Sequence, residues 1–204
     1  DRELKVTVHA PFADINIASP NASLRRAVLK RLKRSLMLSS RLEADLWVFH
    51  PGLGSGVSYF YPGLDWRLNI MSVRELLGLS RIYDVKIAIE NCPEPHPFLL
   101  KNVDDFDRFY RDMEETDIGL TFDVGHANIC GQIYEFMERF SGHIVHVHAH
   151  DNDGTEDSHR GIGRGNVDWP SVVETLKRIG YDGVIIVESV EFIEESLQTL
   201  RNLI

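Results

Sequence analysis

Histidine and carboxylate side chains recur along this sequence at the ends of short apolar runs. Six such runs end in an ionisable residue: His9, His50, Glu90, Asp123, His148 and Glu188. Imidazole and carboxylate are ligands that zinc and manganese accept. Several carboxylates close together repel one another unless a cation lies between them. If the six ends meet in space, the pattern predicts a site for divalent metal ions.

The stretch 145–153, VHVHAHDND, is the densest in metal-ligand types. In a strand His146, His148 and His150 share one face, so at least one of them points toward the strand-end site. Two further pairs extend the set. His126 follows Asp123 by three residues, and Asp157 and His159 lie in the loop after the His148 run.

Taken alone, each of these pairs is equally compatible with a helix cap or a solvated surface loop. Together with the strand ends they give nine candidate ligands: His9, His50, Glu90, Asp123, His126, His148, Asp157, His159 and Glu188. Nine ligands suffice for two or three ions that share a bridging carboxylate. The absence of thiolates from the set disfavours an iron–sulfur cluster or an all-cysteine zinc site. Cys92 and Cys130 are interpreted as small buried apolar residues rather than as a disulfide.

The elements that position these residues alternate between strand and helix. The strands are expected at 4–9, 45–50, 85–90, 118–123, 144–150 and 183–188. The helices are expected at 24–41 after a possible cap at Ser23, at 73–82, 103–113, 132–140, 171–179 before Gly180, and 192–202. This order predicts parallel strands joined by right-handed crossovers.

An open doubly wound sheet and a closed barrel both fit the alternation. Six polar strand ends converge only if the strands form a ring, so we predict an α/β fold of the (β/α)8 TIM-barrel type with its chemistry at the carboxyl ends of the strands. A weakly marked seventh strand is expected within 161–167. Because a closed barrel takes about 250 residues, the first β/α unit is expected to be missing before Asp1.

The composition bounds the class of protein. The chain has 204 residues, 43% of them hydrophobic and 26% charged, which predicts one domain over 1–204. No apolar run is long enough for a membrane helix and no leader opens the chain, so no membrane partner and a cytoplasmic location are expected. The net charge of −9 disfavours a partner bound through many phosphates, unless metal ions place positive charge in the site.

The ordered motifs resemble those of one family. They are HAPF at 9–12, FHPG at 49–52, IEN at 89–91, FDVGH at 122–126, HAHD at 148–151, DSH at 157–159 with GRG at 163–165, and VES at 187–189. Over most of the chain, from Leu4 to about Ser189, this series resembles the xylose isomerase-like barrel superfamily. That superfamily includes sugar-phosphate isomerases and epimerases and the endonuclease IV class of DNA repair enzymes (AP endonuclease family 2).

The resemblance implies how the candidate ligands are divided. Glu90, Asp123, His148 and Glu188 correspond to the central metal site common to both branches. His9 and His50 resemble the ligands of a neighbouring ion that shares Glu90. The remaining three, His126, Asp157 and His159, resemble the ligands of a third ion. The implied cofactor is therefore one to three divalent ions, zinc or manganese.

Two activities follow from the resemblance. In the favoured reading, a metal-dependent isomerase or epimerase, Glu90 and Glu188 form the acid-base pair on either side of a small sugar or sugar phosphate. His150, Arg160 and Arg164 are candidates for holding a phosphate, and Trp66, in the long loop expected after His50, for covering the substrate. Many barrels of this kind pair up, so a homo-oligomer is a further possibility.

The alternative is an endonuclease IV-like zinc phosphodiesterase that acts on abasic DNA, with nucleic acid as its partner. The many histidines and bridging carboxylates suit such a cluster. Three features disfavour it. Arg164 stands between two glycines where an endonuclease often has an acidic residue, and few basic residues fall in the strand-end loops. The basic residues of 24–41 are interpreted as the solvated face of an outer helix.

Overall fold

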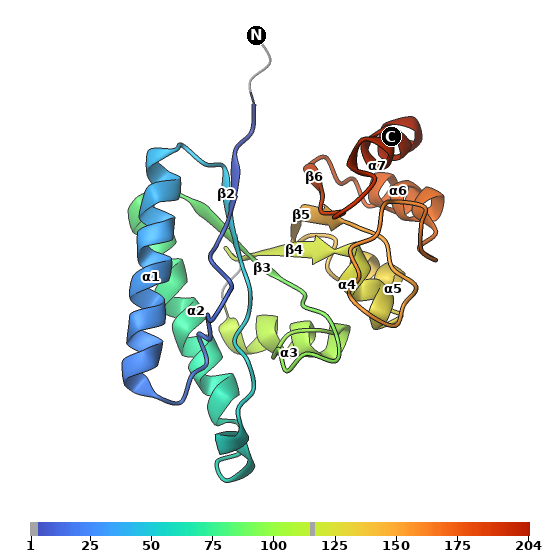
Figure 1. Ribbon diagram of the computed structural model, residues 1–204. Helices are drawn as coiled ribbons and strands as arrows, with labels where there is room; N and C mark the ends of the chain where they lie inside the picture. The colour runs from blue at the N-terminus through green and yellow to red at the C-terminus, as the bar shows by residue number, and fades with distance from the viewer. Residues whose placement is uncertain (1–3, 115–116) are drawn as a thin grey trace. The chain divides into compact units, whose positions relative to one another are not determined.

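The computed structural model describes residues 4–114 and 117–204, and strands and helices alternate along them (Figure 1). The strands are β1 (Thr7–His9), β2 (Leu46–Phe49), β3 (Lys86–Glu90), β4 (Gly119–Asp123), β5 (Ile144–Ala149) and β6 (Val184–Val187). The helices are α1 (Ala22–Arg41), η1 (Gly56–Tyr59), α2 (Leu64–Tyr83), α3 (Val103–Met113), α4 (Val124–Ile129), α5 (Ile133–Arg139), α6 (Trp169–Arg178) and α7 (Ile193–Leu203). All six predicted strands are therefore confirmed, within a few residues at their ends.

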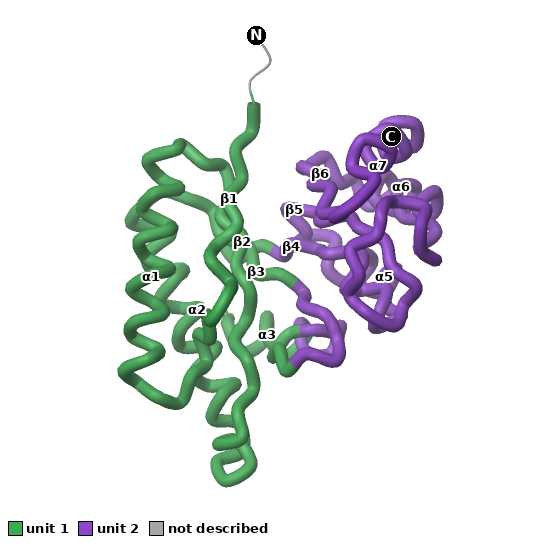
Figure 2. The backbone as a smooth tube through the Cα atoms, viewed as in Figure 1, with its two compact units in different colours: residues 1–90, 97–100, 107–119 green, residues 91–96, 101–106, 120–204 purple. Residues whose placement is uncertain are grey.

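The chain divides into two compact units (Figure 2). Unit 1 comprises 1–90, 97–100 and 107–119, and unit 2 comprises 91–96, 101–106 and 120–204.

Unit 1 is built on the parallel strands β1, β2 and β3. Thr7 pairs with Leu46 and Leu46 with Lys86, so the three strands run in register and their carboxyl ends lie along one edge. Helices α1 and α2 pack side by side in this unit (Figure 1). The buried residues of α1, Leu29, Leu32 and Leu36, recur at helical spacing and form one apolar face. This packing fixes the strand ends that carry His9, His50 and Glu90.

Unit 2 repeats the arrangement with β4, β5 and β6. Asp123 of β4 pairs with His148 of β5, and Ala149 of β5 with Val187 of β6. The core contains a cluster of aromatic rings whose centroids lie 5.5 to 5.9 Å apart: Phe106, Phe122, Phe136 and Phe140. Because β5 is buried on both faces apart from Val145, its last residues are held firmly at the strand end.

Helix boundaries differ from the prediction in several places. The helix predicted at 73–82 begins at Leu64, because the turn at Gly63, with φ of 76°, allows it to start earlier. The cap of α1 is Asn21 rather than Ser23, since the Asn21 side chain accepts hydrogen bonds from the amides of Ser23 and Leu24. Helix α6 ends before Gly180, as predicted, and that glycine has φ of 74°.

Two further local assignments were wrong or missing. The short helix α4 was not predicted, and the segment 161–167 forms turns and bends rather than a seventh strand. The amides of Gly163 and Val167 in this segment donate to the Asp151 carboxylate and not to a neighbouring strand.

Both cysteines are free thiols, as predicted. No described helix combines the length and apolar character required to span a bilayer.

Candidate metal-binding active site

In unit 1 the ends of β1, β2 and β3 bring His9, His50 and Glu90 together. The Nε2 atoms of His9 and His50 each lie 3.3 Å from Glu90 Oε2. Each of the three residues offers one ligand atom, and these atoms lie within 4.8 Å of one another. Glu90 is buried, whereas His9 is exposed. Two imidazoles and one carboxylate at this spacing form a group able to hold a divalent ion.

The backbone carbonyl of Ala10 fixes which ring nitrogen of His9 carries a proton. Its Nδ1 lies 2.8 Å from the Ala10 carbonyl oxygen, which can only accept, so Nδ1 donates. In the neutral ring the Nε2 lone pair then faces Glu90. A backbone carbonyl that orients an imidazole in this way is a common partner of metal-binding histidines.

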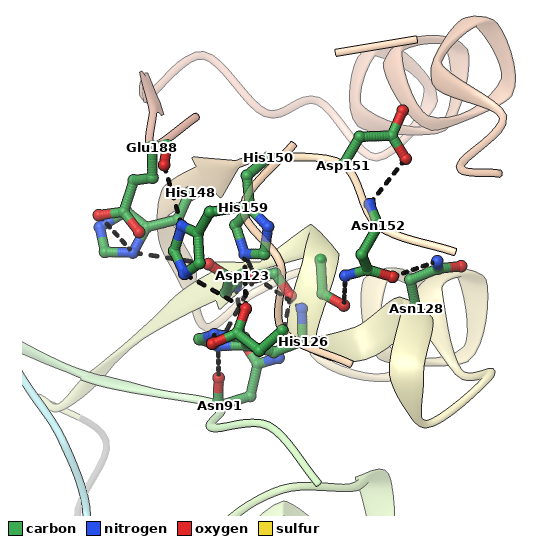
Figure 3. Close-up of polar contacts among 12 residues, drawn as sticks. Asn91, Asp123, His126, Asn128, His148, His150, Asp151, Asn152, His159 and Glu188 are labelled. Carbon is green, nitrogen blue, oxygen red and sulfur yellow. Dashed lines mark hydrogen bonds and ion pairs between the residues drawn. The ribbon is translucent and has the colours of Figure 1, made fainter. Parts of the chain in front are cut away.

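In unit 2 the aligned ends of β4 and β5 place Asp123 beside His148. His148 Nδ1 lies 3.3 Å from Glu188 Oε1 and 3.9 Å from Asp123 Oδ2 (Figure 3). Glu188 directly follows β6, and its amide donates to the Ala149 carbonyl. The predicted ligands Asp123, His148 and Glu188 therefore come together within this unit.

Asp123 also begins helix α4. Its Oδ1 accepts a 2.7 Å hydrogen bond from the His126 amide, so the residue acts as the N-cap and turns His126 into the site. Asn91, which follows Glu90 in the chain, holds the backbone of Asp123 in place. Its side chain accepts from the Asp123 amide at 2.8 Å and donates to the Asp123 carbonyl at 3.0 Å. The FDVGH motif is thus a strand end, a cap and a first helical turn.

A second group in unit 2 surrounds Asp157. His126 Nε2 lies 3.4 Å from Asp157 Oδ2, and His159 Nε2 lies 3.2 Å from Asp157 Oδ1. His150 joins them, with its Nε2 3.7 Å from Asp157 Oδ1 and its ring stacked on that of His159 at 3.8 Å. Asp157 and His159 therefore belong to this cluster and not to a solvated loop.

The charges of this second group attract cations. Burial alone would raise the pKa of Asp157, but hydrogen bonds from His126 and His159 outweigh it and hold that pKa well below its usual range. The hydrogen bond to Asp157 raises the pKa of His159 to about 9, against the opposing effect of burial. A proton or a metal ion is thus favoured beside Asp157.

The loop that carries Asp157 and His159 is organised by Asp151. The Asp151 carboxylate is fully buried and accepts four hydrogen bonds of 2.8 to 3.2 Å, from the amides of Asn152, Gly163 and Val167 and from Trp169 Nε1. Its backbone also pairs with that of Arg160 in both directions. Asn152 extends the network by bonding to Asn128 of α4 (Figure 3). The position of Asp157 therefore depends on Asp151.

Three of the residues predicted to hold substrate have side-chain partners outside the ligand groups. Arg160 pairs with Asp153 at 2.8 Å, and the Arg164 guanidinium covers the Phe192 ring at 4.1 Å. The predicted loop position of Trp66 is wrong, because the residue lies in the first turn of α2 with its Nε1 donating to Asp112. Roles of these three side chains in substrate binding stay predictions.

The family model for the xylose isomerase-like TIM barrel matches residues 1–203. The chain belongs to this family. The predicted α/β class of the TIM-barrel type is thereby confirmed.

Relatives of both predicted branches are similar to this member of the family. An uncharacterized protein of Methanocaldococcus jannaschii is 35% identical over 92% of this chain and 65% of its own length. The probable endonuclease 4 of Aquifex aeolicus is 27% identical over 84% of this chain and 65% of its own length. A crystal structure of a D-tagatose 3-epimerase-like protein is 33% identical, with a TM-score of 0.87, over 98% of this chain and 79% of that protein. This barrel chain thus spans about 65% of the length of these two curated relatives.

Sequence reasoning missed the roles of three residues. Asn91 and Asp151 were not singled out, and His150 was interpreted as a phosphate ligand rather than as a neighbour of Asp157. The available signal for His150 was its spacing of two from His148, which puts both on one strand face. Asp151 gave only a weak signal, since its hydrogen-bond donors are three backbone amides and the Trp169 indole, up to 18 residues away.

Proposed function

We propose that this chain is a metal-dependent isomerase or epimerase of a small sugar or sugar phosphate. The observation that carries the proposal is that each predicted proton-transfer glutamate stands at a strand end beside ligand histidines. Glu90 has His9 and His50 at 3.3 Å, and Glu188 has His148 at 3.3 Å. The likeness to the D-tagatose 3-epimerase-like protein supports the same class of reaction.

The proposed chemistry is proton transfer at a carbon next to a carbonyl. One glutamate carboxylate takes the proton from one face of that carbon, and the other glutamate, protonated, gives a proton to the opposite face. The configuration is thereby inverted, and in the reverse reaction the two residues exchange roles. We assign these roles to Glu90 and Glu188.

The metal belongs to the same proposal. A divalent ion supplies polarisation of the substrate carbonyl and hydroxyl oxygens, which makes the carbon-bound proton more acidic. Each unit has a group that would hold such an ion: His9, His50 and Glu90 in unit 1, and Asp123, His148 and Glu188 in unit 2. Their imidazole and carboxylate donors fit zinc or manganese.

An aromatic surface beside the histidines of unit 1 suits a sugar. The Phe12 ring, whose residue is 62% exposed, lies 5.7 Å from the His9 ring and 5.5 Å from the His50 ring. Phe98 contacts His50 edge-on at 5.6 Å. Aromatic rings provide large apolar contact area beside polar groups. The carbon-bound hydrogens of a sugar would pack on this surface while its oxygens face the ligands.

Hydrogen exchange with each of two epimers tests the glutamate roles. D-tagatose and its 3-epimer are incubated separately in D2O with metal-loaded protein, and deuterium at the reacting carbon is followed by NMR. With two opposed residues, Glu90→Gln stops exchange from one epimer only, and Glu188→Gln stops it from the other only. The matched control is Glu191→Gln, at an exposed position three residues after Glu188.

The two variants also separate proton transfer from metal binding. Loss of exchange from both epimers in both variants would indicate that the glutamates act only as ligands. Unchanged exchange in Glu188→Gln would contradict the proposed mechanism.

A second candidate is the zinc phosphodiesterase. The cluster of His126, Asp157 and His159 and the likeness to the probable endonuclease 4 favour it. Its test is cleavage of a duplex that contains one abasic site, with the intact duplex as control. Cleavage without sugar exchange would replace the first proposal by this one.

A further inference from the structure

We propose that His150 is a fourth protein ligand of an ion held by His126, Asp157 and His159. The four residues would form a closed tetrahedral site within unit 2, with no position left for a water or substrate oxygen. This inference does not depend on the activity proposed above, because it concerns the number of protein ligands at one ion.

The first argument for this site is the spacing of the donor atoms. Each of the four residues offers one ligand atom, and all four atoms lie within 4.8 Å of one another. Tetrahedral zinc has bonds of about 2.0–2.2 Å to nitrogen and oxygen, which sets neighbouring ligand atoms about 3.3–3.5 Å apart. Asp157 Oδ1 lies 3.2 Å from His159 Nε2 and 3.7 Å from His150 Nε2, and Asp157 Oδ2 lies 3.4 Å from His126 Nε2.

The second argument is the orientation of the His126 and His159 rings. His126 Nδ1 donates to the Asn91 carbonyl at 2.7 Å, and His159 Nδ1 donates to the Glu188 carbonyl at 2.9 Å. In each ring Nε2 is therefore the nitrogen that faces Asp157, and its lone pair becomes available to an ion once the ion replaces the proton on that nitrogen. Metal-binding histidines are commonly oriented by a carbonyl on the other nitrogen in this way.

The third argument is the environment of the His150 ring. Its side chain is fully buried, and neither ring nitrogen has a hydrogen-bond partner among the described residues. Nε2 lies 3.1 Å from Asp123 Oδ1, but the contact does not have the angles of a hydrogen bond. A buried polar atom left without a partner is costly. An ion beside Asp157 would satisfy Nε2.

Gly125 makes room for this ring. A Cβ atom at that position would lie 2.1 Å from His150 Cε1, far inside contact distance. The ring is therefore held between α4 and the stacked ring of His159. The tight packing on both sides keeps Nε2 aimed at the cluster (Figure 3).

A closed site has a chemical consequence. Catalytic zinc keeps one open position for water or substrate, whereas four protein ligands are typical of structural zinc. The ion would tie together the first turn of α4, the end of β5 and the loop that carries Asp157. It would not provide the metal-bound hydroxide on which a phosphodiesterase relies.

Cadmium-113 NMR on the wild-type protein, labelled with nitrogen-15 in its histidines, counts the ligands directly. We expect one cadmium resonance to be coupled to three imidazole nitrogens, those of His126, His150 and His159. Coupling of that ion to His126 and His159 alone would overturn the proposal, as would the absence of cadmium from this site. This NMR readout does not use enzymatic activity, so failure of the epimerase proposal leaves the test intact.

Zinc competition with a chelator provides a second readout. We expect His150→Ala to weaken zinc binding at this site at least about tenfold, by comparison with losses caused by removing supporting residues of metal sites. The matched control is His146→Ala, because His146 is likewise a buried histidine, on β5, but lies outside the cluster. Equal zinc affinity of His150→Ala and wild type would overturn the proposal. If His150→Ala does not fold, the NMR experiment on the wild-type protein decides.

Discussion

Replacing Asp151 by asparagine tests whether one buried carboxylate holds the ligand loop. Oδ1 accepts from the amides of Asn152 and Val167, and Oδ2 accepts from the Gly163 amide and Trp169 Nε1. An amide group can accept through only one of its two positions. Its NH2 group would face two N–H donors, so two hydrogen bonds are lost whichever way the side chain is turned.

The expected loss of stability is large. A hydrogen bond to a charged group contributes about 1.5–3 kcal/mol, so two such bonds amount to about 3–6 kcal/mol. Domains are stable by only about 5–15 kcal/mol in total. Asp151→Asn should therefore lower the urea midpoint strongly and reduce zinc affinity, because Asp157 and His159 lie in the loop that it fixes.

Urea unfolding followed by circular dichroism and by tryptophan fluorescence measures this change. The control is Asp153→Asn, whose side chain is 42% exposed and pairs with Arg160, and we expect its urea midpoint to stay close to that of the wild type. A loss below about 1 kcal/mol for Asp151→Asn, within the range of a single neutral hydrogen bond, would refute the reasoning. Unchanged zinc affinity would refute the link from Asp151 to the ligands.

Three further outcomes are expected. Gly165→Ala should displace the same loop and weaken zinc binding in the chelator competition, because its Cβ would lie 2.0 Å from the Asn152 carbonyl oxygen. The control is Gly142→Ala, whose Cβ would meet no atom within 4 Å and which should leave zinc affinity unchanged. Gly78→Ala, in the interior of α2 with open space around it, should raise the free energy of unfolding in urea by about 0.5–1 kcal/mol, and a loss would contradict the helix boundaries. Zinc at about one hundred times its dissociation constant should raise the free energy of unfolding by about 2.7 kcal/mol over the chelated protein, and an unchanged thermal midpoint would contradict folded-state metal binding.

The sequence was most informative where a short apolar run ends in an ionisable residue. The runs before His9, Glu90 and Asp123 are short and apolar, and each ends at the predicted ligand. Parallel register then brings together groups from neighbouring strands, such as Asp123 and His148. For this reason the convergence of strand-end groups within each unit could be predicted without coordinates, whereas their division into metal sites followed from the resemblance to the family.

Features that depend on irregular backbone could not be predicted in the same way. Helix α4 has only six residues, and the Asp123 side chain defines its start, so no helical periodicity marks it. The direction of His150 depends on the space left at Gly125 and on stacking with a residue nine positions later. The early start of α2 placed Trp66 in a helix instead of a loop. Local hydrophobic pattern carries none of this information.

Hydrogen exchange into a ketose by the wild-type protein tests the central proposal most directly. The protein is depleted of metal, reloaded with manganese or zinc, and incubated with D-tagatose in D2O, and proton NMR records the signal of the hydrogen on carbon 3. The account predicts that this signal disappears with metal present and persists without it, while signals of the 3-epimer appear. An undiminished carbon 3 signal with fully loaded protein, across D-tagatose and a panel of other ketoses and ketose phosphates, would contradict it.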